Sequence, residues 1–256
     1  MTRLSEFADV DTLGPAAAVD YLNAAAADLA LLKARLRDLL LAQPGDRILD
    51  VGCGLGDDVR ALCDVVGPEG DVVGFDASAV MIAEAKRRTS HGRARFVRGD
   101  AASMPFPANA FDAVRVERVL QHVADPATAL AELARVLRPA GRIMVAEPDW
   151  PDLRVLACPD DLAEDISRRL MTRIRQPALA RSLTGLLDTL GWCAVREHQL
   201  PLAIHDGVMA RRIVAHSGIT AQVQREWHAR AHELEQRGLP FISVPLIAVT
   251  AQKAQV

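Results

Sequence analysis

Three glycines at alternate positions, directly after an apolar run, are the residues with the clearest chemical meaning in this sequence. Gly52, Gly54 and Gly56 follow Arg47–Val51, whose length and branched side chains are typical of a buried strand. The amphipathic stretch 57–66 comes next, so the pattern predicts a strand, a glycine turn and a helix. Glycine is needed where the backbone takes a positive φ or where a ligand touches the main chain, and a helix N-terminus attracts an electron-rich group. We therefore expect a nucleotide-like ligand; a tight turn without a ligand is the alternative.

The spacing of the glycines argues against a dinucleotide. The fingerprint for NAD or FAD is G-x-G-x-x-G. Here Gly56 comes one position early, and Asp57 stands where the fingerprint has its last glycine. The run from Leu49 to Gly56, Leu-Asp-Val-Gly-Cys-Gly-Leu-Gly, closely resembles motif I of the class I S-adenosylmethionine-dependent methyltransferases. Later segments extend the resemblance over most of the chain, which looks most like the small-molecule branch that includes the ubiquinone and menaquinone biosynthesis C-methyltransferases.

Carboxylates stand at the ends of other predicted strands. Asp76 closes a strand at 71–75, roughly 20 residues after the glycine turn, where a carboxylate can accept both hydroxyls of a ribose. A helix cap or a solvated turn is the alternative for Asp76. After a third strand at 94–97, the segment with Asp100 and Ala101 resembles the family's adenine-binding segment. The resemblance implies that Asp100 accepts the adenine amine and that the Ala101 N–H meets a ring nitrogen.

The ends of the predicted strands should meet at one edge of a sheet. Ligands of parallel α/β sheets bind outside the carboxyl ends of the strands, and the fourth and fifth strands, 111–116 and 141–146, end in Glu117 and Glu147. We therefore expect a site for S-adenosyl-L-methionine at this edge. The resemblance and the strand ends assign to it Asp50, Gly52, Cys53, Gly54, Gly56, Asp76, Ala77, Asp100, Ala101 and Glu117.

Methyl transfer from a sulfonium needs little from the protein beyond placement. The nucleophile must lie in line with the methyl group in the absence of water, and a general base is required only if the nucleophile holds a proton. His122, shortly after the fourth strand, is the candidate catalytic base, or else it packs under a lid. Glu147 and Asp149 are candidates for orienting a substrate, with helix capping as the alternative. Tyr21 is a third candidate substrate contact, or else a packed aromatic with a wet hydroxyl.

The alternation of strands and helices predicts an α/β fold with a parallel sheet. We expect a Rossmann-like, doubly wound, seven-stranded sheet, mostly parallel with an antiparallel last strand, plus N-terminal helices and a helical lid. Residues 1–44 form the N-terminal helical cap, 45–150 the cofactor-binding half, and 151–256 the C-terminal half with a lid at about 203–240. The last strand spans 241–251, and regular pairing should begin at or after Pro245, because proline blocks a ladder bond.

Composition limits the classes of partner. The net charge of −3 leaves no electrostatic footprint for nucleic acid. No stretch of about 18 uninterrupted apolar residues exists, so no membrane association and a cytoplasmic location are expected. No pair among Cys53, Cys63, Cys158 and Cys193 has C-x-x-C spacing, and the histidines of the lid lack metal-site spacing, so no metal is expected. The richness in Ala and Arg suggests a bacterial source, and a monomer or a homodimer fits the length.

The expected function is methyl transfer to a small-molecule acceptor in secondary-metabolite or quinone-like biosynthesis. The alternative is a cofactor-bound biosynthetic enzyme of this fold that performs a non-methylating reaction such as cyclisation. Methylation of nucleic-acid bases is disfavoured, because Glu117-Arg118-Val119-Leu120 replaces the Pro-Pro-aromatic segment of those enzymes. Four arginines near the start of the C-terminal half either face an anionic substrate or form a solvated helix face: Arg168, Arg169, Arg173 and Arg175.

Overall fold

The computed structural model describes residues 15–255 with gaps at 90–91, 93, 157–159, 208–209, 211–212 and 215–219. Its helices are α1 (Pro15–Asp28), α2 (Ala30–Leu39), α3 (Asp57–Val66), α4 (Ala79–Arg88), α5 (Pro126–Val136), α6 (Asp160–Met171), α7 (Leu183–Thr189) and α9 (Ala221–Gln236), with 3₁₀ turns η1 (Leu120–His122), η2 (Trp150–Asp152) and η3 (Leu179–Ser182). The strands are β1 (Arg47–Val51), β2 (Asp71–Asp76), β3 (Ala94–Arg98), β4 (Phe111–Glu117), β5 (Leu137–Pro148), β6 (Arg154–Val155), β7 (Cys193–Ile204) and β8 (Ile242–Gln252).

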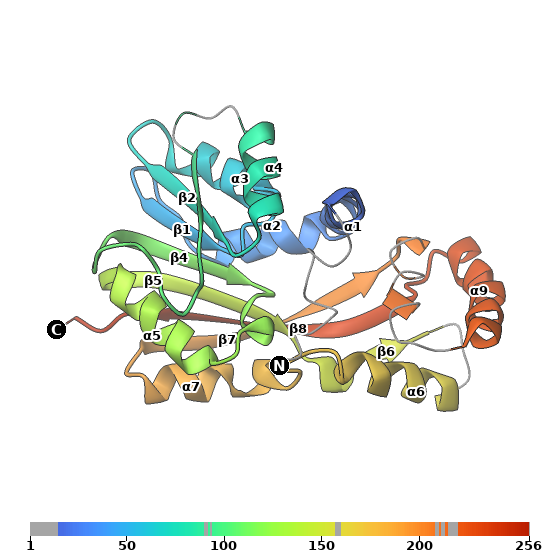
Figure 1. Cartoon of the computed structure of the whole chain (residues 1–256). Coiled ribbons are helices and arrows are strands. Elements are labelled where there is room, and N and C mark those ends of the chain that lie inside the picture. The colour runs from blue at the N-terminus through green and yellow to red at the C-terminus, as the bar shows by residue number, and fades with distance from the viewer. Residues whose placement is uncertain are drawn as a thin grey trace.

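One mixed sheet organises the fold (Figure 1). Its order is β3-β2-β1-β4-β5-β8-β6, and β7 pairs with β8. Neighbours from β3 to β5 run parallel, whereas β8 is antiparallel to β5, β6 and β7. The predicted Rossmann-like architecture with an antiparallel last strand is confirmed. The described sheet has eight strands rather than seven, because the two-residue β6 is too short to leave a periodic signal.

Side chains at the helix starts cap α4 and α5. Ser78 caps α4 by accepting the Met81 N–H at 3.3 Å. Asp125 caps α5, with Pro126 in the first helical position, where its missing N–H costs nothing. The predicted start of pairing at Pro245 is wrong for β7, whose register with β8 runs from Ile242 onward and places Pro201 opposite Pro245. It holds for β5, whose pairing with β8 begins at Leu246.

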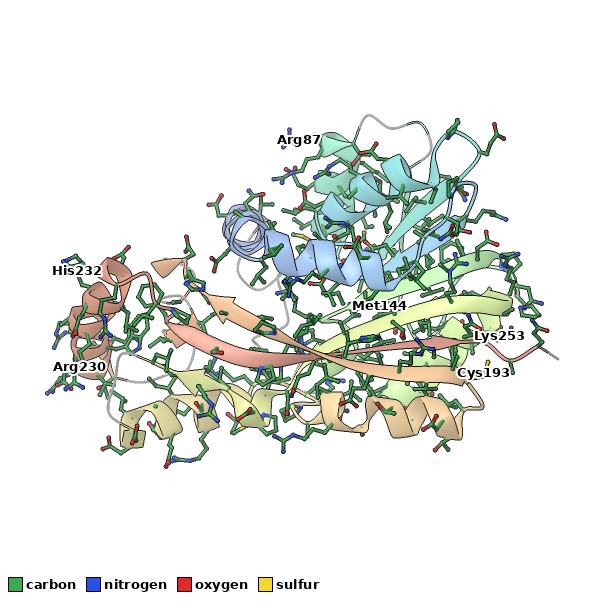
Figure 2. The ribbon with its side chains drawn as sticks, turned by 180° about the vertical axis from the view of Figure 1, so that it is seen from behind. Arg87, Met144, Cys193, Arg230, His232 and Lys253 are labelled. Carbon is green, nitrogen blue, oxygen red and sulfur yellow. The ribbon has the colours of Figure 1, made fainter. Side chains whose placement is uncertain are left out.

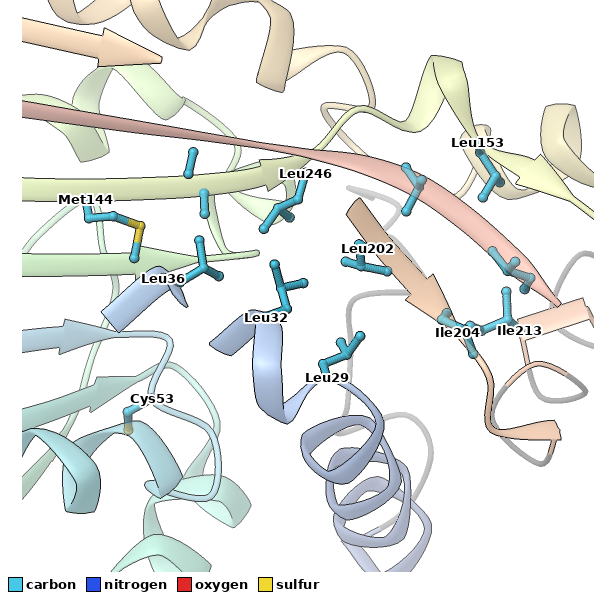
Figure 3. Close-up of a cluster of buried hydrophobic side chains, with 14 of the residues drawn as sticks. Leu29, Leu32, Leu36, Cys53, Met144, Leu153, Leu202, Ile204, Ile213 and Leu246 are labelled. Carbon is cyan, nitrogen blue, oxygen red and sulfur yellow. The ribbon is translucent and has the colours of Figure 1, made fainter. Parts of the chain in front are cut away.

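Helices cover both faces of the sheet, because successive strand side chains point to opposite faces. Ile48 packs on the side of α2 and α3, and its neighbour Leu49 on the side of α5 and α7. Leu32 and Leu36 of α2 point toward Leu246 and Met144 of the sheet (Figure 3). This packing fixes α2 beside the carboxyl ends of the central strands.

The C-terminal half extends the sheet beyond the carboxyl ends of the parallel strands. There β7 and β8 continue toward α9, whose Trp227 is buried and donates its indole N–H to the Leu156 carbonyl at 3.1 Å. Arg230 and His232 of α9 lie at the opposite end of the molecule from Cys193 and Lys253 (Figure 2). Gly218, where the sequence predicts a break between two helices of the lid, and Cys158 lie outside the described residues. The substrate-lid role of 203–240 stays a prediction.

Candidate functional site

The glycine loop between β1 and α3 divides into two packing positions and one open position. All three glycines have positive φ, +72° at Gly52, +51° at Gly54 and +78° at Gly56. A Cβ on Gly52 would lie 2.1 Å from Val119, and one on Gly56 would lie 3.0 Å from Phe96. A Cβ on Gly54 would meet only Leu22, at 3.7 Å. Gly54 is therefore the glycine that a ligand can approach most closely.

Asp76 holds this loop against β2. Its carboxylate accepts the Gly54 N–H at 2.9 Å and the Ser78 N–H at 2.9 Å. The cap of α4 is Ser78, so the capping alternative for Asp76 does not hold. A carboxylate has about four acceptor sites, so two N–H bonds do not preclude ribose hydroxyls. The backbone carbonyl of the next residue, Ala77, accepts a hydrogen bond from Arg98 Nε at 3.0 Å.

Asp100 and Ala101 form a tight turn after β3. The Asp100 carboxylate accepts the Ala102 N–H at 2.9 Å, and Asp100 pairs with Ser103 in an isolated bridge. Ala101 is buried, whereas Asp100 is exposed. Since β3 is parallel to β2, this turn lies at the same edge of the sheet as Asp76. Their contacts with adenine stay predictions.

A buried ionic cluster lies beneath the loop, and it was not expected from the sequence. Arg115 of β4 contacts Asp50 at 2.9 Å, Asp58 at 3.1 Å and also Glu117. Lys33 of α2 contacts Asp58, and Glu117 at 3.4 Å. Two further ion pairs complete the cluster, Arg37 with Asp58 and Arg118 with Glu117. The cluster thus comprises three carboxylates, Asp50, Asp58 and Glu117, and four cations, Lys33, Arg37, Arg115 and Arg118. The overlooked signal is Arg115 in an apolar strand, because a fully buried arginine requires partners.

The carboxylates of the cluster titrate differently. Burial raises the pKa of Asp50 to about 6, against the opposing charge of Arg115. Burial would also raise the pKa of Glu117, but Lys33, Arg115 and Arg118 lower it to about 2. One Asp50 oxygen, Oδ2, is buried without a hydrogen-bond partner in the described chain. A cationic or hydrogen-bond-donating ligand group would satisfy it. Burial raises the pKa of the neighbouring Cys53 thiol, which is therefore neutral.

Glu147 shapes the turn that follows β4. Its Oε1 accepts the N–H groups of Val119 at 2.9 Å and Leu120 at 2.7 Å. The side chain is fully buried, which raises its pKa to about 8 despite those two bonds. The preceding Arg118 takes a left-handed φ of +56°, and its N–H donates to the Ala146 carbonyl at 2.8 Å. The structure thus gives Glu147 a positioning role and encloses the carboxyl that was predicted to contact substrate; it caps no α-helix.

Three candidate residues remain: Asp149, His122 and Tyr21. Asp149 is buried and accepts two bonds from Arg181 Nε, at 2.7 and 2.9 Å, and it makes no side-chain cap on η2. His122 ends η1 with its Nδ1 buried and unpartnered among the described residues. Burial, together with the charges of Arg118 and Arg175, lowers its pKa to about 4, so the imidazole is neutral and a weak base at pH 7. Tyr21 lies on α1, but its side chain is outside the described residues.

Helix α1 covers the glycine loop. Its Leu22 packs near Leu55 and Met81, and Asn23 accepts a bond from Arg88 of α4 at 2.7 Å. At its other end, Asp28 accepts the His205 N–H at 2.8 Å. The predicted N-terminal cap is therefore joined to the cofactor half and to the chain after β7.

The sequence is similar to those of known methyltransferases. A family model described as a methyltransferase domain matches residues 49–145. A ubiquinone/menaquinone biosynthesis C-methyltransferase from Stutzerimonas stutzeri is 31% identical over 189 residues, which cover 65% of this chain and 74% of the relative. The chain belongs to the class I S-adenosylmethionine-dependent methyltransferases.

One further relative and one solved structure are also similar to this chain. An uncharacterized 37.1 kDa protein in a transposon of Streptomyces fradiae is 41% identical over 162 residues, 62% of this chain but only 47% of that protein. The chain therefore spans about half of that relative. The solved [4+2]-cyclase SpnF has a TM-score of 0.58 at 23% identity and covers 88% of this chain and 81% of its own. At that identity the likeness concerns the methyltransferase fold alone.

Proposed function

We propose that this chain transfers the methyl group of S-adenosylmethionine to a small-molecule acceptor. The observation that carries the proposal is the loop at Gly54, which is open toward a ligand, hydrogen-bonded to Asp76 and placed above the buried Asp50. These are the three features that an amino-acid-bearing nucleoside requires: close approach to main chain, an acceptor for ribose and a buried anion for an ammonium group.

The residues present fit this cofactor. The unpartnered Oδ2 of Asp50 would receive the ammonium group, directly or through water. Asp76 would accept the ribose hydroxyls, and Asp100 with the Ala101 N–H would hold adenine. When bound, the cofactor supplies a methyl group already activated by its sulfonium charge.

The residues of the chain would orient the acceptor and exclude water. Helix α1 covers the loop, and the turn of Arg118 to His122 is held by Glu147 at the neighbouring strand ends. A neutral His122 at pH 7 can accept or donate one hydrogen bond to the acceptor. We assign it this orienting role ahead of proton abstraction, because its pKa is lowered to about 4.

The name of a relative supports a class of acceptor. The relative from Stutzerimonas stutzeri is named for quinone biosynthesis, which supports a quinone-like or other secondary-metabolite acceptor. A non-methylating reaction such as cyclisation is the second candidate, and its support is the fold shared with the [4+2]-cyclase SpnF. For the described residues, no helix is both long and apolar enough to cross a bilayer, and a cytoplasmic location and a monomeric or homodimeric state are part of the proposal.

Calorimetry and product analysis test the proposal separately. We expect S-adenosylhomocysteine to bind and NAD to show no measurable binding. Incubation with methyl-labelled S-adenosylmethionine and a bacterial metabolite extract should yield a labelled product. Binding without any labelled product, across extracts, would favour the non-methylating alternative, and tighter binding of NAD would overturn the assignment.

A further inference from the structure

Arg175 lies beside the turn that carries His122. After α6 the chain folds back onto η1, where the Gln176 N–H donates to the Gln121 carbonyl at 3.0 Å. The Gln176 side chain also reaches the Ala124 carbonyl at 3.4 Å. These bonds hold the half-buried Arg175 next to η1, far in sequence from the strand end that supplies Arg118.

Arg175 differs from the arginines around it. Arg168 and Arg169 are neutralised by Asp165 on the exposed side of α6, and Arg181 is neutralised by Asp149. Arg175 forms no ion pair with a carboxylate of the described chain. The structure therefore separates a set of arginines that the sequence could only treat together.

Arg118 is also incompletely neutralised. Its carboxylate partner among the described residues, Glu117, is 3.1 Å away and is shared with Arg115 and Lys33. Its side chain is 24% exposed, and its left-handed φ of +56° is a conformation that costs free energy and recurs at functional sites. His122 follows Gln121, which accepts the Gln176 N–H next to Arg175, and its lowered pKa has the charges of both arginines among its causes.

Arg175, which has no carboxylate partner in the described chain, and Arg118, which shares Glu117 with two other cations, together form a receptor for an anion beside His122. A guanidinium binds a carboxylate or phosphate through paired N–H bonds, and the imidazole adds one more donor. We infer that Arg118 and Arg175 bind an anionic group of the acceptor, a carboxylate or a phosphate, and hold the acceptor beside His122. This inference rests on the proposed function, because it places the acceptor next to the cofactor edge.

Inorganic phosphate titrated into the full chain saturated with S-adenosylhomocysteine tests the inference. Chloride keeps the ionic strength constant, and ¹⁵N-histidine spectra report on His122, whose signal is assigned with His122→Asn. We expect a saturable shift of the His122 signal. Arg175→Gln should weaken phosphate binding about tenfold or more, the scale of one charge-assisted contact, and Arg118→Gln should act in the same direction. Arg168→Gln, which alters an arginine paired on the outer face of α6, is the matched control and should bind as wild type.

The outcomes distinguish this inference from the proposed function. Absence of a saturable shift in the S-adenosylhomocysteine complex, or an unchanged phosphate affinity in Arg175→Gln, overturns the anion site and leaves the cofactor site standing. Competition between phosphate and S-adenosylhomocysteine also overturns it, because the arginines would then serve the carboxylate of the cofactor. A chain that does not bind S-adenosylhomocysteine overturns both.

Discussion

At the scale of the residue, amino acids of the same type have different structural roles at different positions. Gly52 and Gly56 are glycines because neighbouring side chains leave no room for a Cβ, whereas Gly54 leaves its outer side open. Asp76 and Asp50 are both acids at the site, yet Asp76 holds main-chain N–H groups and Asp50 meets Arg115 in the interior. Two predictions concern single side chains.

Asp76→Ala should weaken both cofactor binding and the ligand-free fold. Loss of bonds to the ribose should cost about 2–4 kcal/mol, or about 30- to 1000-fold in affinity. The lost bonds to Gly54 and Ser78 should lower the free energy of unfolding by about 1–2 kcal/mol. Calorimetry with S-adenosylhomocysteine and urea unfolding measure the two effects. Asp71→Ala, at the amino end of the same strand, is the control; wild-type affinity in Asp76→Ala would rule out the ribose contact.

Glu147→Gln should remove a pH dependence of stability. Because the pKa of Glu147 is raised to about 8 in the folded protein, the folded state keeps a proton that the unfolded state has lost. The free energy of unfolding of wild type should therefore fall by a few kcal/mol as pH rises from about 4.5 to 8, and stay level above that. Urea unfolding between pH 5.5 and 9 should show this decline in wild type and in Glu132→Gln, whose parent carboxylate has a pKa lowered to about 2. An equal decline in Glu147→Gln would show that Glu147 is ionised at neutral pH.

At the scale of the element, α2 contributes to the candidate site although it belongs to the predicted N-terminal cap and not to the predicted cofactor-binding half. Its Leu32 and Leu36 pack on the sheet, and its Lys33, one turn before Arg37, reaches the carboxylates of α3 and β4. The helical cap thereby supplies two of the four cations in the ionic cluster. Helix α2 therefore contributes charge to the cluster as well as apolar packing on the sheet.

Lys33→Met should disturb the fold and the site together. Asp58 and Glu117 would each lose a cation while remaining buried, which should lower the free energy of unfolding by about 2–4 kcal/mol. Urea unfolding measures this, and S-adenosylhomocysteine affinity should fall as the loop support loosens. Lys33→Arg should recover much of both, since it keeps the charge. Lys86→Met removes an exposed lysine from α4 and should leave the free energy of unfolding and the S-adenosylhomocysteine affinity at their wild-type values. If Lys33→Met also left both unchanged, the cluster would not depend on Lys33.

At the scale of the whole molecule, the site unites segments that are distant in the chain. The loop after β1, the ends of β2 to β5, α1 and the stretch after α6 all contribute residues near one edge of the sheet. Meanwhile β7, β8 and α9 extend past that edge (Figure 1). Ligand binding should therefore stabilise elements far apart in sequence.

S-adenosylhomocysteine at 100 times its dissociation constant should stabilise the chain by about 2.7 kcal/mol, which raises the melting temperature by roughly 5–10 °C. Hydrogen exchange should slow in α1 and in the glycine loop, because the proposed function places the ligand between them. The amino end of β2, which includes Asp71, is the internal control and should change little. Protection confined to the loop would mean that α1 does not close over the ligand.

The sequence by itself determined the features that depend on near neighbours along the chain. The glycine spacing, the caps at Ser78 and Asp125 and the order of β1 to β5 follow local rules of conformation and periodicity. Only the tertiary structure decided which glycine has free space beside it and that Arg115 contacts three carboxylates. It also decided that the Glu147 side chain is buried, and that Arg175 has no ion pair in the described chain whereas Arg168 and Arg169 pair with Asp165. These depend on burial and charge pairing between residues tens of positions apart. A side chain's pKa and partners are set by what folds against it, and the local sequence carries no record of that.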